Sequence, residues 1–192
     1  MPLNEPDQTT SAAPGHVAST DLFGGTGNEA MERGADISPC GRYRYSLWRK
    51  WGPGATCMFV GLNPSTADAT LDDPTIRRCV GFAKAWGYGA LMMTNLFAFR
   101  STLPSTMKAA IDPVGPDNDL HLRAAYFNSG VVIAAWGAHG THKRRDVQVR
   151  ALLPHLHYLR LTKDGHPGHP LYLPASLKPV PWVTPNVSAR ET

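Results

Sequence analysis

The chain has 192 residues, which is enough for one well-buried domain and too short for two domains of ordinary size. Its net charge of +4, from 19 Lys and Arg against 15 Asp and Glu, is compatible with nucleic-acid binding but also occurs in many soluble enzymes. The three cysteines form no CxxC pair, which suggests a reducing compartment and excludes a four-thiolate zinc or iron–sulfur site built from this chain alone.

The sequence predicts one cytoplasmic domain between two tails. No apolar run reaches membrane-spanning length, and the N-terminus lacks the basic and apolar regions of a signal peptide, so we expect no membrane partner. Residues 1–36 are rich in Pro, Gly, Ser, Thr and Asn without periodicity, which is typical of a flexible tail. Residues 185–192 have the same character, which leaves a single folded domain over residues 37–184.

Strands and helices are predicted to alternate along this domain. The alternating segment RYRYSLW is expected to be a strand that pairs antiparallel with the next one, after the turn KWGPG. Four later segments are typical of further strands, the first three as continuous apolar runs: TCMFVGL, GALMMTNLFAF, GVVIAAWG and LHYLRLT. Three segments between or after these strands are typical of helices: Asp73 to Gly87, GPDNDLHLRAAYFN and THKRRDVQVRALL.

This order predicts the α/β class, because strands that alternate with helices make right-handed crossovers in a mainly parallel sheet. We expect a three-layer α/β/α sandwich with a four-stranded mainly parallel sheet and an antiparallel N-terminal edge strand. Ligands of such sheets bind beyond the carboxyl ends of the strands, where the loops converge. Four loops qualify: Asn63–Asp68, Asn95–Ser101, Trp136–His142 and Thr162–Leu171. Their polar side chains are expected to gather in one pocket: Asn63, Ser65, Asn95, Arg100, His139, His166 and His169.

Two asparagines at strand ends are candidates for this site. Asn63 follows a strand and precedes a proline, where it either makes an ordinary turn or orients a water or a ligand carbonyl with its amide. Asn95 ends the run ALMMTN, where burying a carboxamide is costly unless something pairs with it. It is either satisfied by neighbouring backbone or donates and accepts at the edge of a nucleobase or an amide.

Two histidines, His166 and His169, lie in the segment TKDGHPGHPLYLP, which Pro and Gly stiffen. An H-x-x-H pair without a third ligand at a recognisable spacing gives little support for metal binding, so we expect no metal and no cofactor. A histidine held in place here can stabilise negative charge on a leaving group, while the alternative is a solvated surface loop.

Basic residues on two predicted helices are candidates for phosphate contacts. Lys143 and Arg144 belong to the basic run HKRRDVQVR, and Arg77 and Arg78 lie one turn into an earlier helix. A solvated helix face is the commoner explanation of such basic groups. Ser65 could also hydrogen-bond to a phosphate, although hydroxyls after Asn-Pro also make ordinary turns.

Four segments together resemble a bacterial and phage family known as domain-of-unknown-function family 1643. They are ADISPCGRYRYSLWRKWG, FVGLNPSTADATLDDPTIRRC, MTNLFAFRST and TKDGHPGHPLYLP, and the resemblance covers about residues 35–183. This resemblance implies almost nothing about function.

The chain also resembles the uracil-DNA glycosylase superfamily, which has a parallel sheet flanked by helices. FVGLNPS is similar to the first motif of its mismatch-specific thymine/uracil branch, and LMMTNLF is similar to the strand that contacts the base edge. VVIAAWGAHGTHK resembles the third strand of the superfamily, and GHPGHPLY resembles its His-Pro loop.

This second resemblance implies a role for each matching residue. Asn63 would position the water, Asn95 would contact the base, and Leu171 would wedge into the duplex. His166 would stabilise the departing base anion, with His169 as an inserted residue or the true equivalent, because the loop has one residue more than usual. The uracil-specific branch has an aspartate at the position of Asn63, so a slower enzyme is implied.

The resemblance also implies the surroundings of the substrate. Gly61, Leu62, Pro64 and Ser65 belong to the first motif and would contact the substrate. Ser65 replaces a tyrosine that excludes substituents at the 5-position of the base, which leaves room for a modified pyrimidine.

We therefore expect a DNA glycosylase-like hydrolase that cleaves the N-glycosidic bond of a pyrimidine base in DNA, natural or modified. Its partner would be DNA or a nucleotide, and the DNA backbone would be contacted by basic residues: Arg77, Arg78, Arg100, Lys143 and Arg144. Two alternatives remain open. One is a non-catalytic module that binds nucleic acid or a modified nucleotide, and the other is a hydrolase or transferase that acts on small nucleotides.

Overall fold

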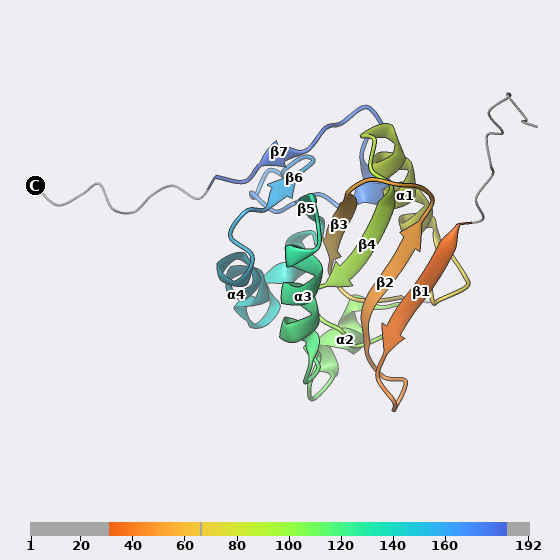
Figure 1. Cartoon of the computed structure of the whole chain (residues 1–192). Coiled ribbons are helices and arrows are strands. Elements are labelled where there is room, and N and C mark those ends of the chain that lie inside the picture. Colours follow the sequence, from red (N-terminus) through yellow and green to blue (C-terminus); the bar gives the residue numbers. More distant parts are fainter. Residues whose placement is uncertain (1–30, 66, 184–192) are drawn as a thin grey trace, which may run out of the picture.

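The computed structural model describes residues 31–65 and 67–183, and it shows a mixed α/β fold built on one seven-stranded sheet (Figure 1). The strands are β1 (Glu32–Ile37), β2 (Arg44–Lys50), β3 (Thr56–Gly61), β4 (Ala90–Asn95), β5 (Val131–Ala134), β6 (His157–Tyr158) and β7 (Val180–Pro181). Across the sheet they follow the order β1-β2-β4-β3-β5-β6-β7.

Four α-helices accompany the sheet in the described part of the chain. They are α1 (Pro74–Ala85), α2 (Pro104–Ala109), α3 (Asn118–Phe127) and α4 (Arg145–Leu152), and two 3-10 helices are η1 (Ala138–Arg144) and η2 (Pro170–Tyr172). None of the helices in these ranges combines the length and the apolar character needed to cross a bilayer.

The parallel part of the sheet agrees with the sequence prediction. Strands β4, β3, β5 and β6 are neighbours in this order, and each adjacent pair is parallel. The sheet is larger than predicted, however, because β2 pairs antiparallel with β4, β1 pairs antiparallel with β2, and β7 adds antiparallel to β6. The parallel strands therefore form the centre of a mixed sheet with antiparallel strands at both edges.

The predicted pairing of RYRYSLW with the next strand along the chain is wrong. Strand β2 pairs with β4, which lies between β2 and β3. The turn after β2 crosses the start of β4 closely, since the backbone N–H groups of Trp51 and Gly52 both donate to the carbonyl of Gly89. A Cβ at Gly89 would lie only 2.3 Å from the carbonyl oxygen of Pro53, so a residue without a side chain permits this crossing.

Strand β1 begins within the segment that the sequence predicted to be a tail over residues 1–36. It pairs with β2 from Glu32 opposite Lys50 to Ile37 opposite Arg44. No side chain of β1 is fully buried, so its sequence lacks the apolar alternation that indicates a strand. Residues 1–30 and the predicted tail over 185–192 lie outside the described residues.

The predicted fourth strand, LHYLRLT, is shorter than expected. Only His157–Tyr158 pair with β5, and Leu161 then forms an isolated antiparallel bridge with Pro167. The second half of the segment therefore turns back and becomes part of the loop that contains both candidate histidines.

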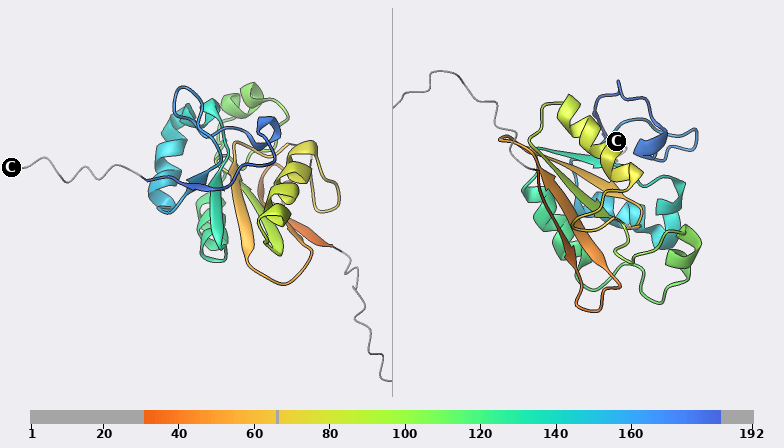
Figure 2. Two further views of the ribbon diagram at one scale, coloured as in Figure 1. Left: turned by 90° about the horizontal axis from the view of Figure 1, so that it is seen from above. Right: turned by 90° about the vertical axis from the view of Figure 1, so that its right-hand side faces the viewer.

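The central strands bury both of their faces, as their continuous apolar runs predicted. On β3, Cys57 and Phe59 pack with the buried residues of α1, while Met58 and Val60 pack in a second cluster with residues of α2, α3 and α4. Figure 2 shows α1 on one side of the sheet and α3 and α4 on the other. The helices thereby leave the carboxyl ends of the parallel strands as the place where the loops meet.

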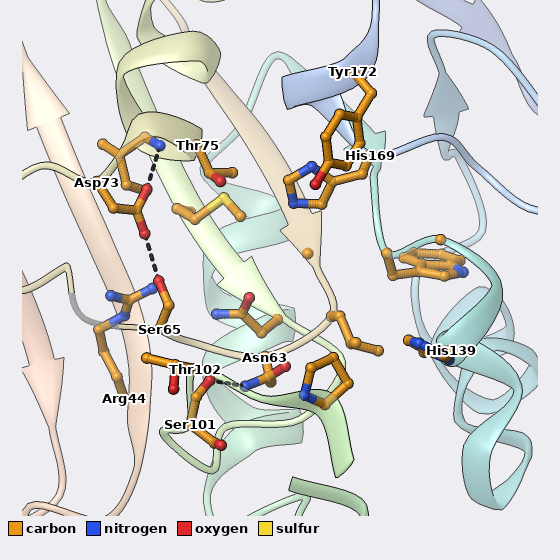
Figure 3. A pocket seen from close by; sticks show the side chains of 18 of the residues that line it. Arg44, Asn63, Ser65, Asp73, Thr75, Ser101, Thr102, His139, His169 and Tyr172 are labelled. Atoms are coloured by element: carbon orange, nitrogen blue, oxygen red, sulfur yellow. Dashed lines mark hydrogen bonds between the residues drawn. The ribbon is translucent and has the colours of Figure 1, made fainter. Parts of the chain in front are cut away.

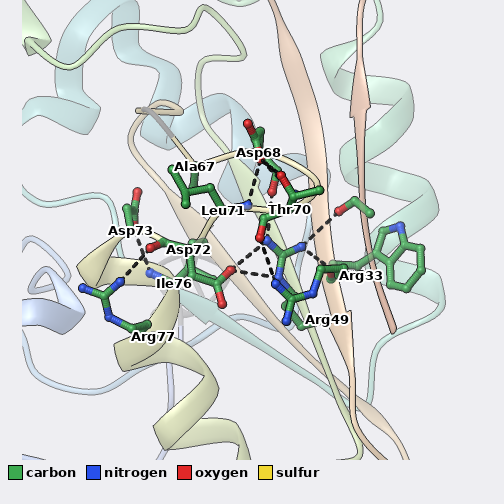
Figure 4. A network of polar contacts seen from close by, with 12 residues as sticks. Arg33, Arg49, Ala67, Asp68, Thr70, Leu71, Asp72, Asp73, Ile76 and Arg77 are labelled. Carbon is green, nitrogen blue, oxygen red and sulfur yellow. Dashed lines mark hydrogen bonds and ion pairs between the residues drawn. The ribbon is translucent and has the colours of Figure 1, made fainter. Parts of the chain in front are cut away.

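A buried ion pair holds the loop between β3 and α1 against β2 (Figure 4). The side chain of Arg49 is fully buried, and its Nη2 lies 2.7 Å from Oδ1 of Asp72. Its Nε donates to the same carboxylate oxygen at 2.8 Å, and its Nη1 donates to the carbonyl oxygen of Trp48 at 2.8 Å. Nη2 also donates to the carbonyl of Asp68 at 2.8 Å. Because this loop also carries the cap of α1, Arg49 fixes where the helix begins.

Replacing Arg49 by methionine is expected to lower the free energy of unfolding by about 3 kcal/mol, because it leaves Asp72 and two partly buried backbone carbonyls without their partner. Urea denaturation of the variant and the parent measures this difference. The control is Lys50→Ala, since Lys50 pairs with Glu32 on the surface and its loss should cost no more than about 0.5 kcal/mol. A loss below about 1 kcal/mol for Arg49→Met would contradict the role of the buried pair.

Candidate functional site

A cavity of about 460 Å³ lies at the carboxyl ends of the parallel strands (Figure 3). All four loops that were predicted to converge contribute to its lining, with Asn63 and Ser65, Asn95 and Ser101, Trp136 to His139, and His169. Strand β2 and the start of α1 complete the wall with Arg44, Asp73 and Thr75. The prediction of a common pocket is therefore confirmed for five of its seven polar residues, whereas Arg100 and His166 do not line the cavity.

Asn63 joins the loop after β3 to the loop after β4. Its Nδ2 donates to the carbonyl oxygen of Ser101 at 2.7 Å and to that of Pro64 at 3.1 Å. Both amide hydrogens are thus used by the protein, and Oδ1 is the part of the side chain that a ligand or a water can use as an acceptor. The turn interpretation and the functional interpretation of Asn63 are therefore compatible with each other.

Asn95 ends β4 as a buried carboxamide with an unused donor. Its side chain is 1% exposed, and its Nδ2 has no hydrogen-bond partner among the described residues. Backbone groups nearby leave this donor unpaired, which disfavours the interpretation of Asn95 as a locally satisfied residue. Since an unpaired buried amide costs about 1–3 kcal/mol, its place in the wall of a cavity points to a ligand that accepts a hydrogen bond.

Gly61 makes room for Asn95. The two residues are paired in the register of β3 and β4, and a Cβ on Gly61 would lie 2.8 Å from Oδ1 of Asn95 and 2.7 Å from Cε of Met93. The glycine of the motif FVGLNPS therefore shapes the cavity through the side chain that it lacks. Of its neighbours, Leu62 lines the cavity, whereas Pro64 is buried and is not a lining residue.

Of the two candidate histidines, His169 is the one that lines the cavity. Its Nδ1 accepts a hydrogen bond from the backbone N–H of Leu171 at 3.3 Å, so the neutral ring carries its proton on Nε2. Burial lowers the pKa of His169, and the attraction of Asp73 opposes this only in part. At neutral pH the cavity therefore contains an uncharged imidazole with one N–H donor.

His166 belongs to a turn outside the cavity. Its carbonyl accepts from the backbone N–H of Thr162 at 2.7 Å, and its own N–H donates to the hydroxyl of Thr162 at 3.1 Å. The sequence prediction preferred His166 over His169, whereas His169 is the histidine that lines the cavity. Leu171 is 40% exposed and is not a lining residue, while its neighbour Tyr172 lines the cavity and is 82% exposed.

The cap of α1 forms another part of the cavity wall. Oδ1 of Asp73 accepts from the backbone N–H of Ile76 at 2.8 Å, so Asp73 is the N-cap of α1. Its Oδ2 accepts from the hydroxyl of Ser65 at 2.5 Å. Both carboxylate oxygens are therefore engaged, and Ser65 is held at the start of the helix.

Arg44 is a functional candidate that the sequence prediction missed. It is 2% exposed and lines the cavity from β2, and its Nη1 donates to the carbonyl of Ala67. Burial lowers the pKa of Arg44 to about 10, so the guanidinium remains charged at neutral pH. The sequence places Arg44 in a strand of alternating polar and apolar residues, where polar residues ordinarily face solvent. In the structure, however, both faces of β2 are covered.

None of the five residues predicted to contact DNA phosphates lines the cavity. The guanidinium groups of Arg77, Arg78 and Arg100 donate to backbone carbonyls, of Asp72, Leu173 and Gly41 respectively. Lys143 and Arg144 are exposed on the surface, in a left-handed backbone conformation with φ of 52° and 55°. Arg77 is exposed as well, so three of the five predicted phosphate contacts are accessible on the surface.

Within the described residues, no group of three or more His, Cys, Asp or Glu side chains could hold a metal ion. The chemistry available in the cavity is that of hydrogen-bond donors and acceptors together with the charges of Arg44 and Asp73. This set suits a polar organic ligand that presents both donors and acceptors.

Comparison with known proteins assigns the chain to a family. A family model described as "Protein of unknown function (DUF1643)" matches residues 44–171. The chain belongs to this family. No curated protein and no solved structure matches the chain. The DUF1643 match begins at Arg44 and ends at Leu171, so it includes Asn63, Asn95 and His169.

The contact between Gly61 and Asn95 can be tested by substitution. Gly61→Ala places a methyl group against Met93 and Asn95, so we expect it to displace Asn95 and to lower the free energy of unfolding by about 1 kcal/mol or more. The matched control is Gly81→Ala in α1, which meets no atom within 4 Å and should stabilise the protein by about 0.5 kcal/mol or more. Urea denaturation measures both, and equal stabilisation by the two changes would show that Gly61 is not tightly packed.

The burial of His169 predicts a pH dependence of stability. Its pKa in the folded protein is lower than the ordinary value of 6.5, so the unfolded chain binds a proton first as the pH falls. The free energy of unfolding should therefore decrease as the pH falls below about 6.5, and His142 and His157 contribute in the same direction because burial also lowers their pKa.

Urea denaturation at about pH 7.5, 6.5 and 5.5 measures this dependence, and His169→Gln should make it shallower because one of the three contributions is removed. The comparison uses the slope with pH, so a constant loss of packing in the variant does not affect it. An unchanged slope in His169→Gln would show that this imidazole takes up its proton equally well in both states.

Proposed function

We propose that the protein is a DNA glycosylase-like hydrolase that cleaves the N-glycosidic bond of a pyrimidine base in DNA, natural or modified. In this proposal the mixed α/β fold is a three-layer α/β/α sandwich of the uracil-DNA glycosylase type, and the protein acts in the cytoplasm. The observation that carries the proposal is the buried, unpaired Nδ2 of Asn95 in a cavity that also contains Asn63 and His169. A carboxamide with a free donor matches the carbonyl acceptors on the edge of a pyrimidine.

The cavity has a size that fits a small ligand of this kind. Its volume of about 460 Å³ lies within the range of ordinary small-molecule sites. A base inside a duplex cannot reach such a cavity, so it must leave the stack, and the exposed Leu171 and Tyr172 of η2 would fill the gap. The exposed Lys143 and Arg144 would then contact phosphates of the DNA backbone.

The hydrolysis has two charges to stabilise. A water attacks C1′ of the sugar, the bond between C1′ and the base nitrogen breaks, and its electron pair leaves with the base while the water proton is released. Asn63 would hold the attacking water through Oδ1, because its Nδ2 is already bonded to Ser101 and Pro64. Nε2–H of His169 would donate to the oxygen on which the negative charge of the base develops.

A neutral His169 suits this role at physiological pH. Because its pKa is lowered, the imidazole of His169 is already neutral at physiological pH, and its N–H can donate a hydrogen bond to an anion. Asn95 would hold the base while the charge forms, since its donor has no competing partner in the described protein. The three side chains would thus have separate tasks: Asn63 would position the water, Asn95 would bind the base edge, and His169 would stabilise the leaving group.

One observation favours a second candidate, a non-catalytic module that binds nucleic acid or a modified nucleotide. Asp73 is the only carboxylate among the described lining residues, and Ser65 and the N–H of Ile76 occupy both of its oxygens. A cavity whose one carboxylate is already engaged lacks a free carboxylate base and would bind its ligand without activating a water in that way. A hydrolase or transferase of small nucleotides remains the third alternative.

A base-release assay tests the proposal. Duplexes and single strands that carry uracil, mismatched thymine, 5-hydroxymethyl or glycosylated pyrimidines are incubated with the protein, and the released base is detected by mass spectrometry. We expect release from at least one substrate, and a loss of about a hundredfold in Asn63→Ala and in His169→Ala. His166→Ala is the matched control, because His166 lies in the same loop outside the cavity, and it should retain activity within about twofold.

The alternatives give different results in the same experiment. Salt-sensitive DNA binding without base release supports the binding module. Turnover of free nucleotides without DNA affinity supports the third alternative. If release is lost in His166→Ala but retained in His169→Ala, the assignment of the leaving-group contact is wrong.

A further inference from the structure

Arg44 differs from the other buried arginines of the protein. Three arginines are buried in the described residues, namely Arg44, Arg49 and Arg145. Arg49 has an ion pair with Asp72 and Arg145 has one with Asp119, and the Nε of each donates a hydrogen bond. Arg44 has neither, because no ion pair involves it and its buried Nε has no partner among the described residues.

This lack of partners is costly for a charged group. A buried cation is normally paired, since removing it from water without compensation costs several kcal/mol. Among the described residues, Arg44 has one side-chain hydrogen bond, from Nη1 to the carbonyl of Ala67, which satisfies one of its five N–H donors. The remaining donors include Nε, which is turned away from solvent and belongs to a side chain in the cavity wall.

Asp73 does not supply the missing partner. It attracts Arg44 electrostatically, and so does Asp68, but Arg100 and Arg49 repel it. Both oxygens of Asp73 are engaged by Ser65 and Ile76, as described above. Figure 3 shows Arg44 beside this Ser65–Asp73 pair, on a wall that also carries the hydroxyl groups of Thr75 and Thr102.

We propose that Arg44 forms an anion subsite in the cavity, so that the ligand is a pyrimidine derivative with a carboxylate or phosphate group. A planar guanidinium binds either oxyanion through two N–H donors, and the Nε edge is one of the two edges that can do so. Thr75 and Thr102 would add hydroxyl donors to the same group. The anionic group would satisfy Arg44 while the base edge satisfies Asn95.

The inference rests on the proposed function only in taking the ligand to be a pyrimidine. Two sources supply the same chemistry. The anion is a carboxylate attached to the base, or it is a phosphate of the nucleotide itself. Thymidine is a neutral reference for both, because its 5′-monophosphate adds a phosphate to it and the 5-carboxylated nucleoside has a carboxylate in place of its methyl group, so the two sources can be separated by binding measurements.

Calorimetric titration of the full chain with three ligands tests the subsite: thymidine, 5-carboxy-2′-deoxyuridine and thymidine 5′-monophosphate. We expect at least one anionic ligand to bind about tenfold more tightly than thymidine, as for a charge-assisted hydrogen bond. Arg44→Gln should remove this preference and leave thymidine binding within about twofold. Lys84→Gln is the charge-matched control, since Lys84 lies in the last turn of α1, and it should keep the preference.

A preference for the carboxylated nucleoside assigns the anion to the base, and a preference for the monophosphate assigns it to the nucleotide. Equal binding of all three ligands by the parent, absence of binding, or an equal loss for thymidine and the anionic ligands in Arg44→Gln would overturn the proposal. Failure to detect base release from DNA would count against the hydrolase and would not affect these binding ratios.

A second measurement covers the case in which Arg44→Gln does not fold. In the ¹⁵N-labelled parent, the Nε–H resonance of Arg44 should shift on addition of the preferred anionic ligand and stay in place with thymidine. Arg44→Lys identifies the resonance by its absence and retains a positive charge, so it should keep part of the preference. If the Nε–H resonance of Arg44 does not shift on addition of the anionic ligand, the proposal that Arg44 binds the anion is wrong.

Discussion

The candidate site depends on the parallel register of β3 and β4, which places Gly61 opposite Asn95. The pairing continues beyond the strands, where the N–H groups of Leu96 and Phe97 donate to the carbonyls of Gly61 and Leu62 at 2.9 and 3.0 Å. Two loops therefore leave the sheet together and stay joined as far as the contact between Asn63 and Ser101. A slip by one residue would turn Asn95 to the other face of the sheet, so the register decides whether the cavity has its carboxamide at all.

The central strands and the first helix of this fold can be predicted from the sequence because their signals are local. Continuous apolar runs mark β3, β4 and β5, and Asp73 before Pro74 marks the start of α1. The arrangement of the edges could not be predicted in this way. Strand β1 has no buried side chain, and the pairing of β2 with β4 depends on a turn that crosses Gly89, which is far from it in sequence. The presence of β1 and the pairing of β2 with β4 therefore depend on contacts between distant residues, which the local residue pattern does not reveal.

The candidate site shows the same division between local and distant signals. Asn63 and Asn95 could be chosen from the sequence because each lies at the carboxyl end of an apolar strand. The choice between His166 and His169 could not be made, because it depends on how the loop is held. The carbonyl of Pro167 accepts from the N–H of Gly137 at 2.9 Å, and the N–H of Gly168 donates to the backbone carbonyl of Arg160 at 2.8 Å. These bonds hold the second half of the loop over the cavity and leave His166 in the outer turn. Arg44 was missed because a charged residue in a strand gives no sign that both faces are covered.

The position of β1 has a practical consequence for anyone who shortens the chain. The family match begins at Arg44, one strand later than the sheet does. A fragment trimmed to the matched residues would lose the partner of β2 and expose its row of unpaired N–H and C=O groups. Such bare edges recruit strands from other molecules, so the fragment would be prone to self-association through the strand that carries Arg44. The polar, sparsely buried segment Glu32–Ile37 thus protects the solubility of the whole sheet, although it contributes little to the core.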